Sequence, residues 1–397
     1  MRKILVLALL AGLPLLALAQ QPQQYVSETD HYRVISDSSQ SQAEDLSRRM
    51  EAALTFYNNL FHFDLSLLPT KFNVKIFKDL DSFNAYLSSI ISQTRTDFVF
   101  ITWSDPSKSE LLCFPKEDKA FTASLLHQGA VQFLKGFVDN APLWLREGIA
   151  TYLDASTYDS STATFTHHAN LAWLDGLKAN IRGENPENTI PFTDLLSFTR
   201  DMAQAKQELF IEESWGLVQF LLSSQQPEYN RIMWDAVSSL DPHGSLDANS
   251  AKVRKRAFSW VADQKLRQDF EAFVLSLKTA NDLVREGIDL YTKGDLTQAE
   301  QSFSSAVALR PGSSAGWYYL GLIAYSRKDY AKADDLYMKA FQLGANAPTI
   351  NYALGVNAFA AGKNAEAVKY LTFAKDADPS TYAEKVDALL KKIGPVK

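Results

Sequence analysis

The chain has 397 residues, of which 46% are hydrophobic and 12% aromatic, so it can build the cores of two or three domains. Its 46 acidic and 40 basic residues give a formal net charge of -6 at pH 7. This excess of negative charge disfavours nucleic acid as the main partner, because phosphate binding needs a basic surface.

The N-terminus has the three parts of a secretory signal peptide, predicted over residues 1–19. Arg2 and Lys3 precede an apolar run, which ends in the small-residue pattern A-L-A before Gln20. Residues 20–28 are polar and are expected to form a disordered leader. No later stretch reaches the roughly 20 apolar residues of a membrane-spanning helix. These features predict an exported protein, periplasmic or secreted, that has no transmembrane segment.

Residues 29–245 show strands first and helices later, an order typical of an α+β domain. Alternating apolar residues predict a strand at 72–76, and further strands are expected at 31–35, 98–103 and 111–114. Helical spacing predicts a helix at 39–61, and another helix is expected at 79–91. The lone Cys113 is expected to be a buried thiol without an internal disulfide partner. Residues 155–166 are rich in Ser and Thr and are expected to form an exposed loop or hairpin. Further helices are expected at 171–177, 192–198, 212–222 and 229–240.

Two helices joined by a polar turn are predicted over residues 127–154, with Pro142 near the start of the second. His127 and Val131 lie four residues apart and therefore share one face of the first helix. This is the spacing of H-E-x-x-H, in which two imidazoles bind zinc, the Glu acts as general base and a third ligand comes from elsewhere. Here Gln128 stands at the Glu position and Val131 at the second His position.

The stretch resembles the peptidase MA-like (gluzincin) family, in a branch that carries W-L-x-E-G-x-A after its H-E-x-x-H. Residues 144–150 match the second motif in order, whereas the first motif is degenerate. The resemblance covers roughly residues 32–240 and implies a metallopeptidase-like α+β fold. It places His127 on the first zinc ligand, Glu147 on the third, Gln128 on the catalytic Glu and Val131 on the second zinc His.

The two departures from the family motif predict a domain that has no catalytic residues. Val131 has no lone pair for a metal, and the amide of Gln128 takes no proton from water near neutral pH. Because a catalytic zinc needs three protein ligands, no metal and no cofactor are expected; a metal, if bound, would be held by His127 and Glu147. His127 is otherwise expected to pack in a partly buried helix. Glu147 either caps or pairs within its own helix, or belongs to a vestigial polar cleft.

An internal repeat of 34 residues marks the C-terminal part. Glycines recur with this period at 287, 321 and 355, and alanines at 299, 333 and 367 and at 306, 340 and 374. Together with W-x-x-L-G at 317–321, this pattern makes residues 280–381 resemble three tetratricopeptide repeats. Residues 382–397 are expected to be a capping helix and tail, and residues 246–279 connecting helices with a short basic run.

The second resemblance implies an all-α solenoid in which the first helix of each repeat lines a concave groove. By the family pattern, nine apolar and aromatic side chains face this groove: Val284, Ile288, Tyr291, Tyr318, Leu322, Tyr325, Tyr352, Val356 and Phe359. Such a set fits an apolar peptide or a neighbouring helix better than a terminal carboxylate. The alternative is that several of these residues are core between repeats.

Three functions stay open at this point. The first is an exported protein-binding scaffold that joins a catalytically degenerate peptidase-like domain to a repeat array, which binds a protein or peptide. The second is an active zinc peptidase with non-standard ligands, in which His167 or His168 would join His127 and Glu147. Against it, adjacent side chains point apart, so this histidine pair is expected at the surface. The third is a repeat-based envelope assembly factor with the N-terminal domain as a structural platform.

Overall fold

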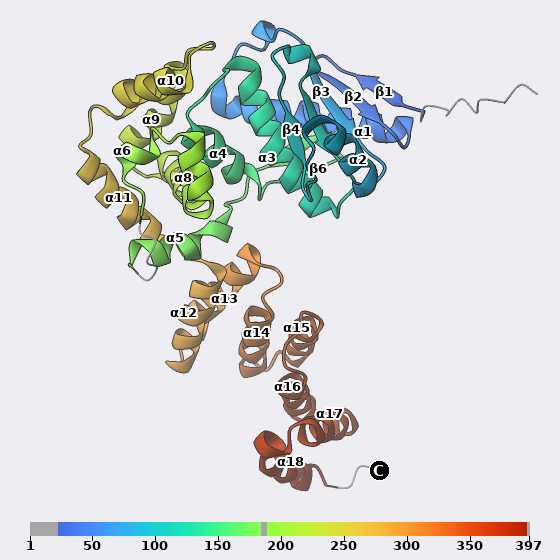
Figure 1. Ribbon diagram of the computed structural model, residues 1–397. Coiled ribbons are helices and arrows are strands. Elements are labelled where there is room, and N and C mark those ends of the chain that lie inside the picture. Colours follow the sequence, from blue (N-terminus) through green and yellow to red (C-terminus); the bar gives the residue numbers. More distant parts are fainter. Residues whose placement is uncertain (1–22, 184–188, 395–397) are drawn as a thin grey trace, which may run out of the picture. The chain divides into compact units, whose positions relative to one another are not determined.

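The computed structural model describes residues 23–183 and 189–394. The chain divides into two compact units. The first contains the described residues up to Asn170 together with Thr189–Leu266, and the second contains the described residues from Leu171 to 183 and from Arg267 to 394. Most of the described residues are helical, and a small sheet lies in the N-terminal part (Figure 1). The predicted signal peptide lies outside the described residues.

The first unit contains a five-stranded sheet with the order β1-β2-β3-β5-β4. The strands are β1 (Tyr25–Glu28), β2 (Tyr32–Ser36), β3 (Phe72–Ile76), β4 (Val99–Ile101) and β5 (Glu110–Cys113). β2, β3 and β5 run parallel, and the edge strands β1 and β4 are antiparallel to their neighbours. Val34 and Val74 pair across β2 and β3 and are both buried, and the burial of Val74 agrees with the apolar alternation over 72–76. Cys113 is buried and free, also as predicted.

The prediction of a disordered leader over residues 20–28 is wrong for β1. Tyr25 pairs with Ser36 of β2, and Ser27 Oγ lies 2.9 Å from Ser47 Oγ. Backbone pairing along the sheet edge orders this segment, although it contributes few apolar side chains to the core.

Helices cover the sheet and extend the first unit beyond it (Figure 1). They are α1 (Gln40–Phe61), α2 (Leu80–Ile91), α3 (Asp118–Phe137), α4 (Leu143–Leu153), α6 (Phe192–Leu195), α7 (Arg200–Ala205), α8 (Gln207–Ser223), α9 (Pro227–Ser238) and α10 (Leu246–Val253). A hairpin of β6 (Thr157–Asp159) and β7 (Thr164–Thr166) follows α4, where a loop or hairpin was expected. Short polar side chains begin the first two helices: Ser39 caps α1 and Asp79 caps α2 by accepting backbone N–H bonds.

Helix α4 is held in place mainly by α8. Trp144 of α4 and Trp215 of α8 are fully buried, and Gly148 lies directly against the backbone carbonyl of Ser214. A side chain at position 148 would collide with that carbonyl, so the glycine of the W-L-x-E-G-x-A motif permits close helix packing. Because Glu147 precedes this contact, the packing also fixes where its carboxylate lies.

The unit boundaries differ from the predicted domains, 29–245 and 246–279. α10 and the π-helical turn Arg254–Phe258, predicted to be connecting helices, belong to the first unit. α5 (Leu174–Ile181), predicted inside the N-terminal domain, belongs to the second unit. There the buried Lys178 donates to the carbonyl of Leu277 and lies 3.0 Å from Oδ2 of Asp282. This long-range pair explains why local sequence did not reveal the boundary.

The second unit continues with α11 (Asp263–Ser276), on which the division between units falls, and with three helix pairs. The pairs are α12 (Ala280–Thr292) with α13 (Leu296–Leu309), α14 (Ser314–Ser326) with α15 (Tyr330–Gln342), and α16 (Ala347–Ala360) with α17 (Asn364–Ala377). A last helix, α18 (Pro379–Ile393), packs against α17. The recurring glycines lie where the helices of a pair meet: Gly287 faces Phe303, Gly321 faces Tyr337 and Gly355 faces Leu371.

Candidate functional site

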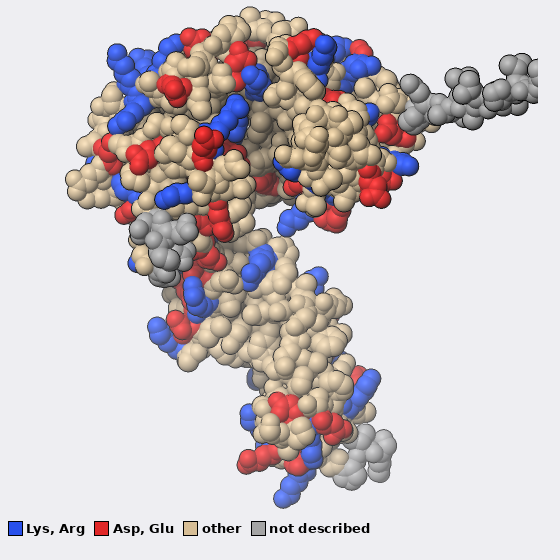
Figure 2. All heavy atoms as spheres, viewed as in Figure 1, with Lys and Arg blue, Asp and Glu red and all other residues tan. Residues whose placement is uncertain are grey.

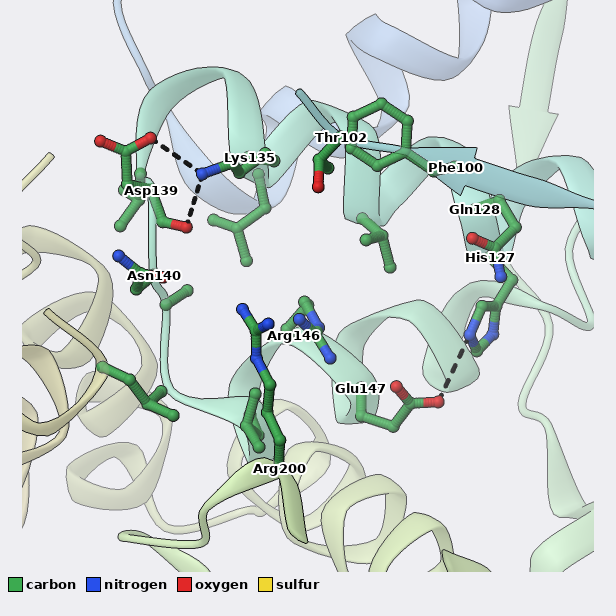
Figure 3. Close-up of a pocket in the computed structure, with 16 residues that line it drawn as sticks. Phe100, Thr102, His127, Gln128, Lys135, Asp139, Asn140, Arg146, Glu147 and Arg200 are labelled. Atoms are coloured by element: carbon green, nitrogen blue, oxygen red, sulfur yellow. Dashed lines mark hydrogen bonds and ion pairs between the residues drawn. The ribbon is translucent and has the colours of Figure 1, made fainter. Parts of the chain in front are cut away.

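The imidazole of His127 lies between two carboxylates. His127 comes from the middle of α3, whereas Glu147 lies in the second turn of α4 and Asp154 follows its last residue. Nε2 of His127 is 3.3 Å from Oε1 of Glu147 (Figure 3). Its Nδ1 is 3.3 Å from Oδ1 of Asp154. The structure therefore brings together the two residues that the first resemblance paired, and Glu147 is bound across two helices rather than within its own.

Asp154 is a member of this cluster that the sequence prediction missed. It lies seven residues, or two helical turns, after Glu147, so both carboxylates face the same side of α4. That spacing was a usable signal. Because Asp is common at helix ends, the spacing alone does not separate a ligand of His127 from an ordinary terminal residue.

The cluster favours a protonated imidazole. Burial alone would lower the pKa of His127, but hydrogen bonds and charges from Asp154 and Glu147 outweigh it and raise that pKa to about 10. Burial pushes the pKa of Glu147 upward, but the hydrogen bond and charge of His127 and the charge of Arg146 leave it lowered. Burial raises the pKa of Asp154 despite its bond to His127. Near neutral pH the cluster therefore contains an imidazolium, which has no lone pair to offer a metal.

The residues at the motif positions do not fit a catalytic zinc. In a tetrahedral zinc site with bonds of about 2.0–2.1 Å, two ligand atoms lie about 3.3 Å apart. Nε2 of His127 and Oε1 of Glu147 have this separation, so these two residues alone would be compatible with zinc. The site lacks a third donor, because Val131 lines the same pocket and has no donor atom. Among residues 23–183 and 189–394, no group of three or more His, Cys, Asp and Glu side chains is arranged to hold a metal ion.

A pocket of about 410 Å³ opens beside this cluster within the first unit (Figure 3). His127, Gln128 and Val131 of α3 line it together with Glu147 of α4, which lies beside His127. Arg146 of α4 and Arg200 of α7 also project into the pocket. Neither arginine was predicted as a site residue, because Arg146 occupies the variable position of the second motif and α7 is remote in sequence.

The histidine pair considered as replacement ligands lies elsewhere. The ring of His167 stacks on Tyr152 with centroids 4.2 Å apart, and Nε2 of His168 is 3.0 Å from Oγ1 of Thr157. Neither residue lines the two pockets to which His127 belongs. Their side chains contact different partners, as expected for adjacent residues.

The nine predicted groove residues lie three each on α12, α14 and α16, and all nine are half-buried. Eight of them, all except Phe359, are seen to pack at the margins of three hydrophobic clusters in the described part of the second unit. Figure 2 shows that the middle of the repeat region carries few charged side chains on the visible face. These residues therefore both support the core between helices and present part of their surface, so the two interpretations of them are compatible.

Comparison with known proteins bears on the second unit. A family model described as tetratricopeptide repeat matches residues 284–348. Tetratricopeptide repeats therefore occupy this stretch. The match lies outside the first unit, for which the peptidase MA-like resemblance stays a prediction.

A comparison with curated protein sequences finds no match. Among solved structures, the chain is similar to the type III secretion translocator chaperone SycD of Yersinia enterocolitica, with 19% identity. That match covers 31% of this chain and 91% of the chaperone chain, with a TM-score of 0.27.

Tyrosines from several helices of the tetratricopeptide region come close together. The rings of Tyr291 and Tyr319 lie 5.9 Å apart, and those of Tyr318 and Tyr337 lie 6.0 Å apart. Burial raises the pKa of Tyr318 to about 12, with further contributions from the neighbouring Tyr319, Tyr382 and Tyr291. Tyr291, Tyr319 and Tyr382 belong to α12, α14 and α18, so tyrosines of different helices influence Tyr318. Tyrosine combines an apolar ring face with a hydrogen-bonding hydroxyl group.

Proposed function

We propose that the protein is an exported protein-binding scaffold whose repeat groove binds an apolar peptide segment of another protein. The observation that carries this proposal is the row of nine half-buried side chains on α12, α14 and α16, which combine aliphatic surface with tyrosine rings. Large aromatic side chains bury much area at little cost in conformational entropy, which makes them effective contacts in protein recognition.

In this proposal the first unit is a peptidase-like domain that hydrolyses nothing. Its support is the chemistry of the cluster around His127, where an amide replaces the general base and an isopropyl group replaces the second imidazole. The imidazolium held by Glu147 and Asp154 then serves as an ion-paired link between α3 and α4.

Binding of the chain from residue 20 onward to an array of apolar peptides tests the groove. The double variant Tyr318→Ala/Tyr352→Ala should weaken binding at least about tenfold, because it removes two central ring contacts. The matched control is Phe341→Ala/Phe373→Ala, which removes two exposed rings from α15 and α17 and should leave binding unchanged. Circular dichroism establishes that each variant is folded.

The outcome also separates the scaffold from the assembly-factor alternative. Loss of every captured peptide in the groove variant means that the repeats do all the binding and that the first unit is a platform. If the groove variant still bound every peptide, the proposal that the groove binds peptides would be contradicted, and binding would be placed in the first unit.

A further inference from the structure

Two guanidinium groups enter the pocket beside His127, and neither forms an ion pair within residues 23–183 and 189–394. Arg146 is half-buried inside the pocket, and Arg200 is exposed at its edge (Figure 3). Within the described part of the chain neither guanidinium forms an ion pair or hydrogen bond, and Nε of Arg146 is buried without any partner. Buried polar atoms are nearly always satisfied, so an unpaired guanidinium in a cavity needs an explanation.

The other charged groups of the pocket are already matched. Nζ of Lys135 lies 2.9 Å from Oδ1 of Asp139. Glu147 is engaged by His127, which also pairs with Asp154 outside this pocket. The two arginines are therefore the cations that the pocket leaves open to an incoming anion.

Arg146 and Arg200 also repel one another. Burial lowers the pKa of Arg146, the neighbouring Glu147 opposes that effect, and the charge of Arg200 lowers it further. Arginine stays protonated in proteins, so the repulsion persists at neutral pH. An anion placed between the two guanidinium groups would relieve it.

We propose that this pocket binds a carboxylate that is attached to an apolar group, with Arg146 and Arg200 as its cationic contacts. Guanidinium groups bind carboxylates through paired N–H donors. Leu134 of α3, Val138 directly after that helix and Leu143 of α4 supply an apolar wall for the rest of the ligand. Glu147 lies in the same pocket, so a singly charged carboxylate is accommodated with less repulsion than a phosphate group.

The carboxylate has two possible sources: the C-terminus of a peptide or a small organic acid. This site is distinct from the repeat groove, whose lining is aromatic and apolar. The carboxylate proposal can therefore fail while the scaffold function stands. Equally, the groove can fail to bind peptides while the pocket binds a carboxylate.

Calorimetric titration of the full chain from residue 20 onward tests the proposal with four probes: N-acetyl-leucyl-leucine, the same peptide as its C-terminal amide, 4-methylpentanoate and inorganic phosphate. We expect the peptide acid to bind at least about tenfold more tightly than the amide and than phosphate. Tighter binding of the peptide acid identifies a peptide C-terminus as the source. Tighter binding of 4-methylpentanoate identifies a small acid, and either result supports the carboxylate site.

Arg146→Gln and Arg200→Gln should each weaken binding of the acid at least about tenfold. Arg95→Gln is the matched control, because Arg95 is an exposed arginine of the same unit that lines neither pocket of His127. The thermal midpoint of Arg146→Gln without ligand should stay level or rise, since the change removes a buried unpaired charge. A merely structural arginine would lower that midpoint.

Several results would overturn the proposal. They are equal binding of acid and amide, tightest binding of phosphate, no binding of either acid up to about 10 mM, or unchanged affinity in both variants. Arg200 is exposed, so Arg200→Gln keeps the test valid even if Arg146→Gln does not fold.

Discussion

The imidazole of His127 has two carboxylate neighbours, and the protonation state of this imidazole decides what the cluster can do. As an imidazolium it links α3 to α4 through Glu147 and Asp154. As a neutral imidazole it would have a lone pair for a metal, but the pKa of about 10 places that form at alkaline pH. The imidazolium form therefore offers no lone pair to a metal.

The ion-paired histidine predicts a particular pH dependence of stability. Because the folded-state pKa of about 10 lies above the ordinary value of 6.5, the contribution is fully present below pH 6.5 and is lost as the pH rises toward 10. His127→Gln should therefore lower the unfolding free energy by about 2 kcal/mol at pH 6, and by progressively less at pH 8 and pH 10. Urea unfolding at the three pH values measures this.

His243→Gln is the control for that series. His243 also lies 3.0 Å from a carboxylate, that of Asp139, but its side chain is 90% exposed. Exposed pairs contribute little, so this variant should unfold like the parent at every pH. A constant difference between His127→Gln and the parent across the range would contradict the pairing.

The missing zinc donors can be supplied by substitution. In the double variant Gln128→Glu/Val131→His, a second imidazole joins His127 on one face of α3, and Glu147 completes three ligands. We expect this variant to bind zinc stoichiometrically after dialysis, with a thermal midpoint that rises when zinc is added. The parent chain should contain no stoichiometric zinc by elemental analysis. Failure of the double variant to bind zinc would show that the cleft geometry differs from that of a zinc site.

At the scale of the elements, close helix packing in the repeats depends on glycine. A Cβ at position 321 would lie 2.5 Å from Cε1 of Tyr337, whereas a Cβ at Gly312 would meet no atom within 4 Å. Gly321→Ala should destabilise the second unit by about 1–3 kcal/mol, since overpacking outweighs the better helix propensity of alanine. Gly312→Ala should change stability by less than about 0.5 kcal/mol. Thermal unfolding of both variants gives the comparison, and equal midpoints would contradict it.

Local signals predicted most elements and missed those set by distant contacts. Apolar residues at helical spacing predicted the helix at 39–61, which is α1, and glycines and alanines at a period of 34 residues predicted the repeat helices. β1 was missed because its order comes from pairing with β2. At the site, His127 and Glu147 were found through a motif. Arg146 and Arg200 were missed, because only the fold places them in one pocket.

At the scale of the whole molecule, the helix α5 belongs to the second unit, although its residues lie between two stretches of sequence that form the first unit. Lys178 of α5 is almost fully buried and pairs with Asp282 at the start of α12. Asp282 also pairs with Arg285, so it keeps one cation when Lys178 is removed. Lys178→Met should therefore destabilise the second unit by about 2 kcal/mol and leave the first unit unchanged.

Hydrogen exchange resolves the two units in that test, with amides of α12 expected to exchange faster and amides of α3 expected to keep their rates. Lys375→Met is the control, because the Lys375–Asp387 pair in the same unit is more exposed. Faster exchange throughout the first unit as well would contradict the assignment of α5 to the second.

The placement of α5 also affects how the protein is made and how it can be divided. During synthesis α5 leaves the ribosome well before Leu277 and Asp282 exist, so its lysine must wait for its partners while the remainder of the first unit is completed. No single cut of the chain yields both units whole. A fragment that starts at α12 contains every repeat helix and still lacks Lys178, one of the two cations that pair with Asp282 in its first turn.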